Sequence, residues 1–271
     1  MYDPALMVLP EHRSLDLDQR PWWHRAALEG QPQIADPELA KFRQEGFKVP
    51  PQSDQQLSEM MANYYGMISH VDHQVGRLIE GLKQNGQFEN TLIVFTSDNG
   101  GERFSDNWPL VGGKMDLTEG GIRVPWIAHW PAVIAPGGTS TQHCMTMDWS
   151  ATMVELAGAK ARDDLPFDGV SMLPVLRDAQ HQFERPLYWR MNHRGQRALR
   201  LGDYKYLRVD GHEYLFNIPA DERERANLAQ REPARLDAMR QAWEAWDATV
   251  PAIPEDATIS LGYSVKDMPQ R

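Results

Sequence analysis

The residue types with the clearest chemical potential lie between positions 91 and 125. An apolar, β-branched run from Leu92 to Thr96 predicts a buried strand, and Ser-Asp-Asn-Gly-Gly follows it directly. Asp98 and Asn99 therefore place a carboxylate and a carboxamide side by side where the strand ends, the edge at which open α/β sheets bind ligands. Both groups are hard oxygen donors, which suit Ca²⁺ or Mg²⁺ better than a soft metal.

A cationic group follows in the same stretch of chain. Lys114 comes after Gly112 and Gly113, and glycines allow the backbone to approach a ligand closely. An ammonium group stabilises negative charge that develops on an oxyanion in a transition state. Two metal ligands and a lysine on one loop are what the binding of a doubly charged oxyanion requires.

Each of these residues also has a simpler explanation. Asp-Asn-Gly commonly closes a strand as an Asx turn, and a loop lysine is usually solvated. For Glu119 and Arg123 we favour a buried pair that holds the loop in shape. Single residues therefore do not decide between ligand binding and loop structure.

The residues between the carboxylate and the lysine are candidates for substrate specificity. Arg103, Asn107 and Trp108 lie in this part of the loop, where they could contact the organic portion of a substrate. Loop positions often determine specificity, although they also vary freely. We predict a substrate-contacting role for these three residues.

The motifs, taken in order, resemble the second half of the sulfatase family, which includes the arylsulfatases and lies within the alkaline-phosphatase-like superfamily. The similarity is collinear and covers residues from about 55 to about 250. Asp-Asn-Gly alone is a weak signal, whereas the ordered set is a strong one. The set comprises Val-Asp-His-Gln-Val-Gly at 71–76, TSDNG at 96–100, the GGK and EGGIRVP segments at 112–125, Asp-Gly-Val-Ser at 168–171 and the strand at 197–206.

The resemblance implies a role for three of the candidates. Asp98 and Asn99 would be ligands of Ca²⁺ or Mg²⁺, and Lys114 would be a catalytic residue that contacts the sulfate and the departing oxygen. The resemblance also implies a sulfated small molecule or carbohydrate as substrate. The chain would then belong to a sulfuric ester hydrolase.

The family's nucleophile has no counterpart in this sequence. In the family it is a formylglycine made from the first residue of a Cys/Ser-x-Pro-x-Arg motif. Cys144 is followed by Met145 and Thr146, and no serine has proline two residues later. The resemblance therefore implies the carboxyl-terminal half of a sulfatase, with formylglycine expected only in a complementary amino-terminal half.

Two other functions remain open. Phosphate or phosphonate ester hydrolysis occurs in the same superfamily with a different nucleophile, although the GGK and EGGIRVP segments favour a sulfatase. The third hypothesis is a non-catalytic half that binds an anion or a protein partner. An exposed apolar face, where further strands would pair, would indicate the third hypothesis.

Composition excludes some classes of partner. A hydrophobic content of 41% and a charged content of 24% are typical of globular proteins. The net charge of −10 argues against nucleic acid, because no basic patch is present to neutralise phosphates. No apolar run is long enough to cross a bilayer, so no membrane partner is expected. One cysteine leaves the compartment open, and a periplasmic or secreted location is compatible with it.

The elements around the motifs predict an α/β fold. Ser53 and Gln56 form a capping-box pattern, and apolar residues then recur at three- and four-residue steps until Gly86, which predicts a long helix. A second strand at 124–130 and a helix at 148–158 follow the strand at 92–96. This order predicts part of an alkaline-phosphatase-like sheet flanked by helices.

The last third of the chain predicts a different arrangement. Short strands at 186–190, 198–209 and 213–217 are separated by turns, which predicts a small antiparallel sheet. A helix at 236–246 would pack on one face of it. We therefore predict a carboxyl-terminal part of the catalytic domain over residues 1–178 and a small α+β subdomain over residues 179–271.

Overall fold

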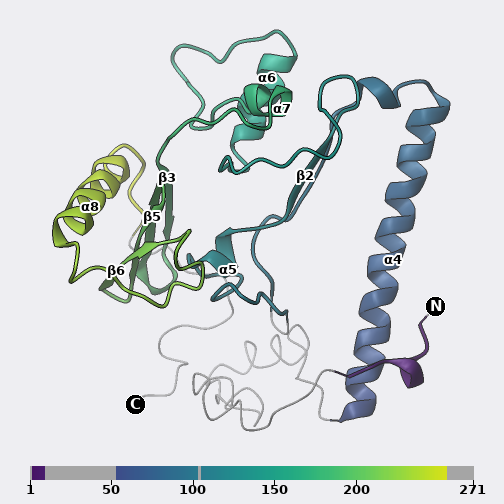
Figure 1. Ribbon diagram of the computed structural model, residues 1–271, viewed down its shortest axis with the longest axis horizontal. Coiled ribbons are helices and arrows are strands. Elements are labelled where there is room, and N and C mark those ends of the chain that lie inside the picture. The colour runs from purple at the N-terminus through teal and green to yellow at the C-terminus, as the bar shows by residue number, and fades with distance from the viewer. Residues whose placement is uncertain (1, 10–52, 103–104, 255–271) are drawn as a thin grey trace. The chain divides into compact units, whose positions relative to one another are not determined.

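The computed structural model of the chain describes residues 2–9, 53–102 and 105–254 (Figure 1). These residues fall into two compact units. The first contains the short 3₁₀ helix η1 (Pro4–Leu6) and the long helix α4 (Asp54–Gln84), and the second contains every other element from residue 85 onward. The domain boundary that we place after residue 178 stays a prediction.

Helix α4 begins and ends as the sequence predicts. The side-chain oxygen of Ser53 accepts the backbone N–H of Gln56 at 3.2 Å, which caps the first turn. The helix ends at Gln84, and Gly86 follows with a φ of 68°, a left-handed conformation that glycine adopts without strain. Among the described residues, no helix combines the length and apolar character needed to cross a bilayer.

The strand before the Asp-Asn-Gly motif pairs with the strand after the EGGIRVP motif. Strand β1 (Ile93–Thr96) and strand β2 (Trp126–His129) are antiparallel, with Thr96 opposite Trp126. The hydroxyl of Thr96 also donates to the carbonyl of Pro125 at 3.1 Å. Residues 97–125 therefore begin and end at the same end of the β1–β2 ladder, which brings the Asp-Asn-Gly and EGGIRVP motifs close together.

The carboxyl-terminal part forms a small antiparallel sheet, as predicted, and this sheet is a four-stranded meander (Figure 1). One prediction about it was wrong: the single strand at 198–209 is two strands. The chain reverses at Gly202, which has a φ of 52°, so that Leu201 pairs with Tyr204. The strands are β3 (Leu187–Met191), β4 (Gln196–Leu201), β5 (Tyr204–Val209) and β6 (His212–Asn217), and the short 3₁₀ helix η3 (His193–Gly195) joins the first two.

The meander lies between two apolar layers. Helix α8 (Pro233–Asp247) packs on one face, where Met239 and Trp243 contact Leu199, Tyr206 and Leu215. The opposite face packs against the segment that follows Lys114. Its buried cluster consists of Leu117, Ala198, Leu207, Phe216 and Ile218, with Ile122 of the short helix α5 (Glu119–Ile122) packed against it.

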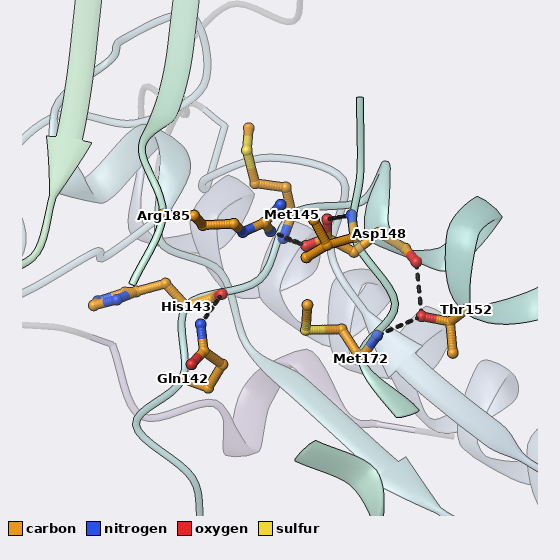
Figure 2. A network of polar contacts seen from close by, with 8 residues as sticks. Gln142, His143, Met145, Asp148, Thr152, Met172 and Arg185 are labelled. Atoms are coloured by element: carbon orange, nitrogen blue, oxygen red, sulfur yellow. Dashed lines mark hydrogen bonds and ion pairs between the residues drawn. The ribbon is translucent and has the colours of Figure 1, made fainter. Parts of the chain in front are cut away.

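A buried carboxylate anchors the region between β2 and β3. Asp148, at the start of helix α6 (Asp148–Leu156), has no exposed surface. Its carboxylate accepts the N–H groups of Met145 at 2.6 Å and Val170 at 3.0 Å. Arg185, which leads into β3, forms an ion pair with the same carboxylate (Figure 2). One side chain therefore joins three separate segments of the chain.

Thr152 extends this network by one step (Figure 2). Its hydroxyl donates to the backbone carbonyl of Asp148 at 2.7 Å and accepts the N–H of Met172 at 2.9 Å. Met172 precedes helix α7 (Leu173–Arg177), so the start of that helix is held against α6. Buried polar groups stabilise a fold when they have partners, and the carboxylate of Asp148 and the hydroxyl of Thr152 both do.

We expect Asp148→Ala to lower the free energy of unfolding of the second unit by about 3–5 kcal/mol, because it leaves the buried Arg185 guanidinium and two N–H groups without partners. Urea unfolding followed by tryptophan fluorescence measures the change. Asp164→Ala is the control, since its pair with Arg162 is more than two-thirds exposed and we expect little change in the free energy of unfolding. Equal losses in the two variants would contradict the anchoring role.

Candidate functional site

The two halves of the motif are joined by backbone hydrogen bonds. The N–H of Lys114 donates to the carbonyl of Gly101 at 2.9 Å, and the N–H of Gly100 donates to the carbonyl of Gly121 at 2.9 Å. Residues 98–101, the strand-end segment, therefore lie against residues 111–121, the lysine loop. The predicted metal ligands Asp98–Asn99 and the predicted catalytic lysine belong to these two joined segments.

The two segments approach so closely that a side chain would not fit between them. A Cβ atom on Gly100 would lie 1.8 Å from the carbonyl oxygen of Gly120, and one on Gly113 would lie 2.6 Å from that of Gly101. Backbone atoms cannot move aside as a flexible side chain can. Glycine at these two positions is therefore required by the close approach of the segments, whatever ligand they bind.

Asn107 braces the same contact. Its side-chain oxygen accepts the N–H of Gly101 at 3.3 Å, and its side-chain nitrogen donates to the carbonyl of Gly112 at 2.9 Å. The carboxamide thus connects the strand-end segment to the lysine loop. Its predicted contact with substrate stays a prediction, and the structure adds a supporting role that the sequence did not indicate.

Of the other two predicted substrate-contacting residues, the structure describes Trp108 but not Arg103. The Trp108 side chain is largely solvent-accessible, with 69% of the residue exposed, and the guanidinium of Arg223 lies 4.0 Å from its ring centre. The ring is thus held by a cation–π contact while much of its surface is open. Arg103 lies outside the described residues.

The ammonium of Lys114 is accessible. It lies 3.4 Å from a carboxylate oxygen of Glu102, and the two side chains are 45% and 65% exposed. A pair this exposed is worth less than about 1 kcal/mol, so an incoming anion can displace the carboxylate. The Lys114 backbone is therefore held by its hydrogen bond to Gly101, whereas its ammonium stays accessible to an anion.

The described residues include oxygen donors but no complete set of metal ligands. Asp98 is exposed and Asn99 is half-buried, and both end in oxygen donors of the kind that Ca²⁺ and Mg²⁺ prefer. Among the residues that the structure describes, no group of three or more His, Cys, Asp or Glu side chains could hold a metal ion. The donor chemistry fits a hard cation, but further ligands would have to complete its coordination.

Glu119 and Arg123 do not form the buried pair that we predicted. The carboxylate of Glu119 lies 2.9 Å from the ammonium of Lys205, and Arg123 instead lies 3.7 Å from Glu222 with both side chains at least half exposed. Helix α5 directs Glu119 toward the meander, where a buried carboxylate needs a buried cation. A second carboxylate, that of Glu224, lies 2.8 Å from the same ammonium.

The sequence contained a signal for Lys205 that was missed. Side chains alternate between the two faces of a strand, so Lys205 shares a face with Leu207 in β5. A lysine at an inward-facing position of an apolar strand implies a buried anionic partner. Nothing in the local pattern identifies that partner, because Glu119 lies far away in the sequence.

The surroundings of Cys144 disfavour the thiolate form of its side chain. Burial raises the pKa of its thiol, and the negative charge of Asp148 raises that pKa further. Reactive cysteines show the opposite shift, because the thiolate is the nucleophile.

A cavity of about 570 Å³ lies away from the joined segments. It is bounded by β3, β4 and the end of α8, with Arg190, Arg197 and Trp243 among its lining residues. Arg197 shares its sheet face with Leu199, which contacts α8. The cavity thus opens on the α8 side of the meander and does not include Asp98 or Lys114.

Comparison with known proteins identifies the class of this fold. The Sulfatase family description fits residues 21–159, and that of N-sulphoglucosamine sulphohydrolase, C-terminal, fits residues 113–238. The structure is similar to that of Ps i-CgsB in complex with k-i-k-neocarrahexaose, with a TM-score of 0.62, 31% identity and coverage of 79% of this chain and 46% of that one. The fold is that of the alkaline-phosphatase-like hydrolases.

The chain belongs to the sulfatase family. N-acetylgalactosamine-6-sulfatase of Rattus norvegicus is 36% identical over 162 residues, which are 56% of this chain and 30% of that protein. The phosphonate monoester hydrolase of Agrobacterium radiobacter is similar in structure, with a TM-score of 0.51, 25% identity and coverage of 73% and 43% of the two chains. The chain therefore spans less than half the length of each of these relatives.

We expect Gly100→Ala to separate the strand-end segment from the lysine loop, because the new methyl group would meet the Gly120 carbonyl. Overpacking of this kind costs about 1–3 kcal/mol. Amide hydrogen exchange at Gly100 and Lys114 should accelerate. Gly76→Ala in α4 is the matched control: it meets no atom within 4 Å, and Ala favours a helix by about 1 kcal/mol. Unchanged exchange in Gly100→Ala would contradict the close contact.

Proposed function

We propose that this chain provides the metal- and sulfate-binding part of a formylglycine-dependent sulfuric ester hydrolase. The observation that carries the proposal is the hydrogen bond between the N–H of Lys114 and the carbonyl of Gly101. It ties the loop that bears the ammonium to the segment that bears Asp98 and Asn99. Family membership supports the same reaction class.

Each residue has a defined task in this proposal. The Asp98 carboxylate and the Asn99 carboxamide would hold Ca²⁺ or Mg²⁺, which when bound neutralises charge on the sulfate oxygens. Lys114 would bind the same group through its ammonium and stabilise the charge that builds up on the departing ester oxygen. The nucleophile would come from a complementary amino-terminal half, since neither the motif nor an activated cysteine occurs in this sequence.

A sulfated carbohydrate is the substrate class that we propose. One relative is named for N-acetylgalactosamine 6-sulfate chemistry, and another has a structure with bound neocarrahexaose. The exposed ring of Trp108, held in place by Arg223, suits stacking against a sugar. Asn107 is used mainly to support the loop, so Trp108 is the better candidate for contact with the organic part.

An exposed apolar pair is the sign expected of a half that binds a protein partner, and a complementary half of the enzyme would be such a partner. Phe95 and Ile127 face each other across the β1–β2 ladder and are 58% and 60% exposed. In the part of the chain that the structure describes, this ladder has two strands, so its outer edges have no strand partners. Apolar strands with open edges favour pairing with another strand. We propose that a further part of the catalytic domain covers this ladder.

Phosphonate ester hydrolysis is a second candidate. The structural similarity to a phosphonate monoester hydrolase favours it. A cation and an ammonium would stabilise the oxygens of a phosphonate as they do those of a sulfate, because both are tetrahedral oxyanions. The residues described here would serve either reaction, and the choice rests with the nucleophile and the substrate pocket.

The metal role can be tested on the chain as it is. We expect Mn²⁺, a paramagnetic ion that accepts hard oxygen ligands, to broaden the NMR signals of the Gly100 and Lys114 amides. The broadening should disappear in the double variant Asp98→Ala, Asn99→Ala, because both donors are lost. Asp163→Ala, an exposed carboxylate elsewhere, should retain it. Equal broadening in all three proteins would rule out the proposed ligands.

The nucleophile assignment predicts that the chain alone does not turn over 4-nitrophenyl sulfate or an aryl phosphonate ester. The release of nitrophenol measures the first reaction directly. Turnover by the chain alone that is lost in Lys114→Ala but kept in the exposed-lysine control Lys160→Ala would contradict the assignment of the nucleophile to another half. In a complex with a nucleophile-bearing half, preference for the sulfate or the phosphonate would then separate the two candidate reactions.

A further inference from the structure

We propose that Lys205 of the carboxyl-terminal meander is a positioning residue for the candidate site, acting through Glu119 and Glu224 to hold the lysine loop against the strand-end segment. The catalytic meaning of this role rests on the proposed function. The structural role does not, because it concerns contacts within the chain. Lys205 touches none of the proposed metal or sulfate ligands, so it would act only through the loop.

The first step is a closed set of buried contacts. Lys205 has no exposed surface, and its ammonium lies 2.9 Å from Glu119 Oε1 and 2.8 Å from Glu224 Oε1. The second oxygen of Glu224 accepts the backbone N–H of Glu119 at 2.7 Å. Each member therefore contacts both others. Buried charges are costly unless they are paired, so this geometry can form only when Glu119 is in place.

The second step connects Glu119 to the strand-end segment. Glu119 is followed directly by two glycines that carry the contacts of the site. The N–H of Gly120 donates to the carbonyl of Val111 at 2.8 Å, and the carbonyl of Gly121 accepts the N–H of Gly100 at 2.9 Å. A displacement of Glu119 would therefore be transmitted to Gly100, two residues after Asp98.

The meander holds the lysine loop at a second point as well. Gln196 of β4 is buried, with 2% of the residue exposed. Its side-chain oxygen accepts the N–H of Leu117 at 2.9 Å, and its side-chain nitrogen donates to the carbonyl of Met115 at 2.8 Å. Met115 has a φ of 80°, a conformation that a non-glycine residue adopts only when its surroundings enforce it. Gln196 therefore binds the lysine loop at Met115, the residue next to Lys114, and again at Leu117.

The charges explain why removing Lys205 would act on the loop. The ammonium faces two carboxylates, and the buried Arg200 guanidinium lies nearby. Burial lowers the pKa of Arg200, and the charges of Glu119 and Glu224 oppose that shift. Burial raises the pKa of Glu224, and Lys205 opposes that shift. Without Lys205, the two carboxylates would lose the cation that each contacts directly, and their like charges would repel each other. That repulsion would weaken the contact between Glu224 and the Glu119 N–H.

The test removes the Lys205 charge and compares amide hydrogen exchange at the candidate site with exchange inside the meander. We expect Lys205→Met to accelerate amide hydrogen exchange at Gly100 and Lys114 about tenfold, through local opening. The amides of Leu199 and Leu207, inside the meander, should change less than about twofold. Lys205→Arg should restore part of the protection, because a guanidinium can also pair with both carboxylates.

Two further variants keep the test decisive. Arg240→Met removes a cation from the α8 side of the same meander, where Arg240 pairs with Glu213, and should leave exchange at Gly100 unchanged. Glu224→Gln keeps the size of the side chain and an acceptor for Glu119, and should give a smaller acceleration, about threefold. It reports on the role if Lys205→Met does not fold.

The outcomes separate this inference from the proposed function. Uniform acceleration throughout the second unit, or none at Gly100, in both Lys205→Met and Glu224→Gln would overturn the positioning role. Loss of Mn²⁺ broadening in Lys205→Met, with Asp98 and Asn99 intact, would support it and extend it to the metal. If the unmodified chain shows no Mn²⁺ broadening, the proposed function fails, and hydrogen exchange still decides the role of Lys205.

Discussion

The candidate site depends on two peptide hydrogen bonds between the strand-end segment and the lysine loop. A peptide hydrogen bond contributes about 1 kcal/mol net, whereas ordering the backbone of one residue costs about 1–2 kcal/mol. The segments contain several glycines, which lose the most conformational freedom on folding. Two such bonds cannot by themselves hold the segments in one geometry. The supports around them are therefore part of the site.

Those supports come from different parts of the chain and use different chemistry. Asn107, within the connection itself, bridges the two segments through its carboxamide. Gln196 and Lys205 reach the lysine loop from the meander, and Leu117 of the loop packs into an apolar cluster with residues of the meander. Apolar packing supplies most of the free energy, since it is roughly proportional to the area buried. The polar contacts fix the position of the lysine loop relative to its neighbours, because their donors and acceptors are paired in only one arrangement.

The sequence predicted the elements better than it predicted their partners. The limits of α4, the Asp-Asn-Gly strand end and the antiparallel meander follow from capping, periodicity and turn residues, all of which are local. The error at 198–209 arose because apolar alternation continues on both sides of Gly202, and one glycine does not distinguish a bulge from a turn. The pairing of Glu119 with Lys205 is set by tertiary contact, and no local pattern encodes it.

The position of the Lys114 ammonium shows why an accessible charge and a fixed backbone belong together. An ammonium on a flexible side chain stabilises developing charge only if its backbone starts from the right place. The exposed contact with Glu102 holds the ammonium weakly, so a doubly charged oxyanion could displace that carboxylate at little cost. The net charge of −10 would disfavour such an anion at long range. Selectivity therefore has to come from short-range contacts, which makes rigid placement of this loop the central requirement of the site.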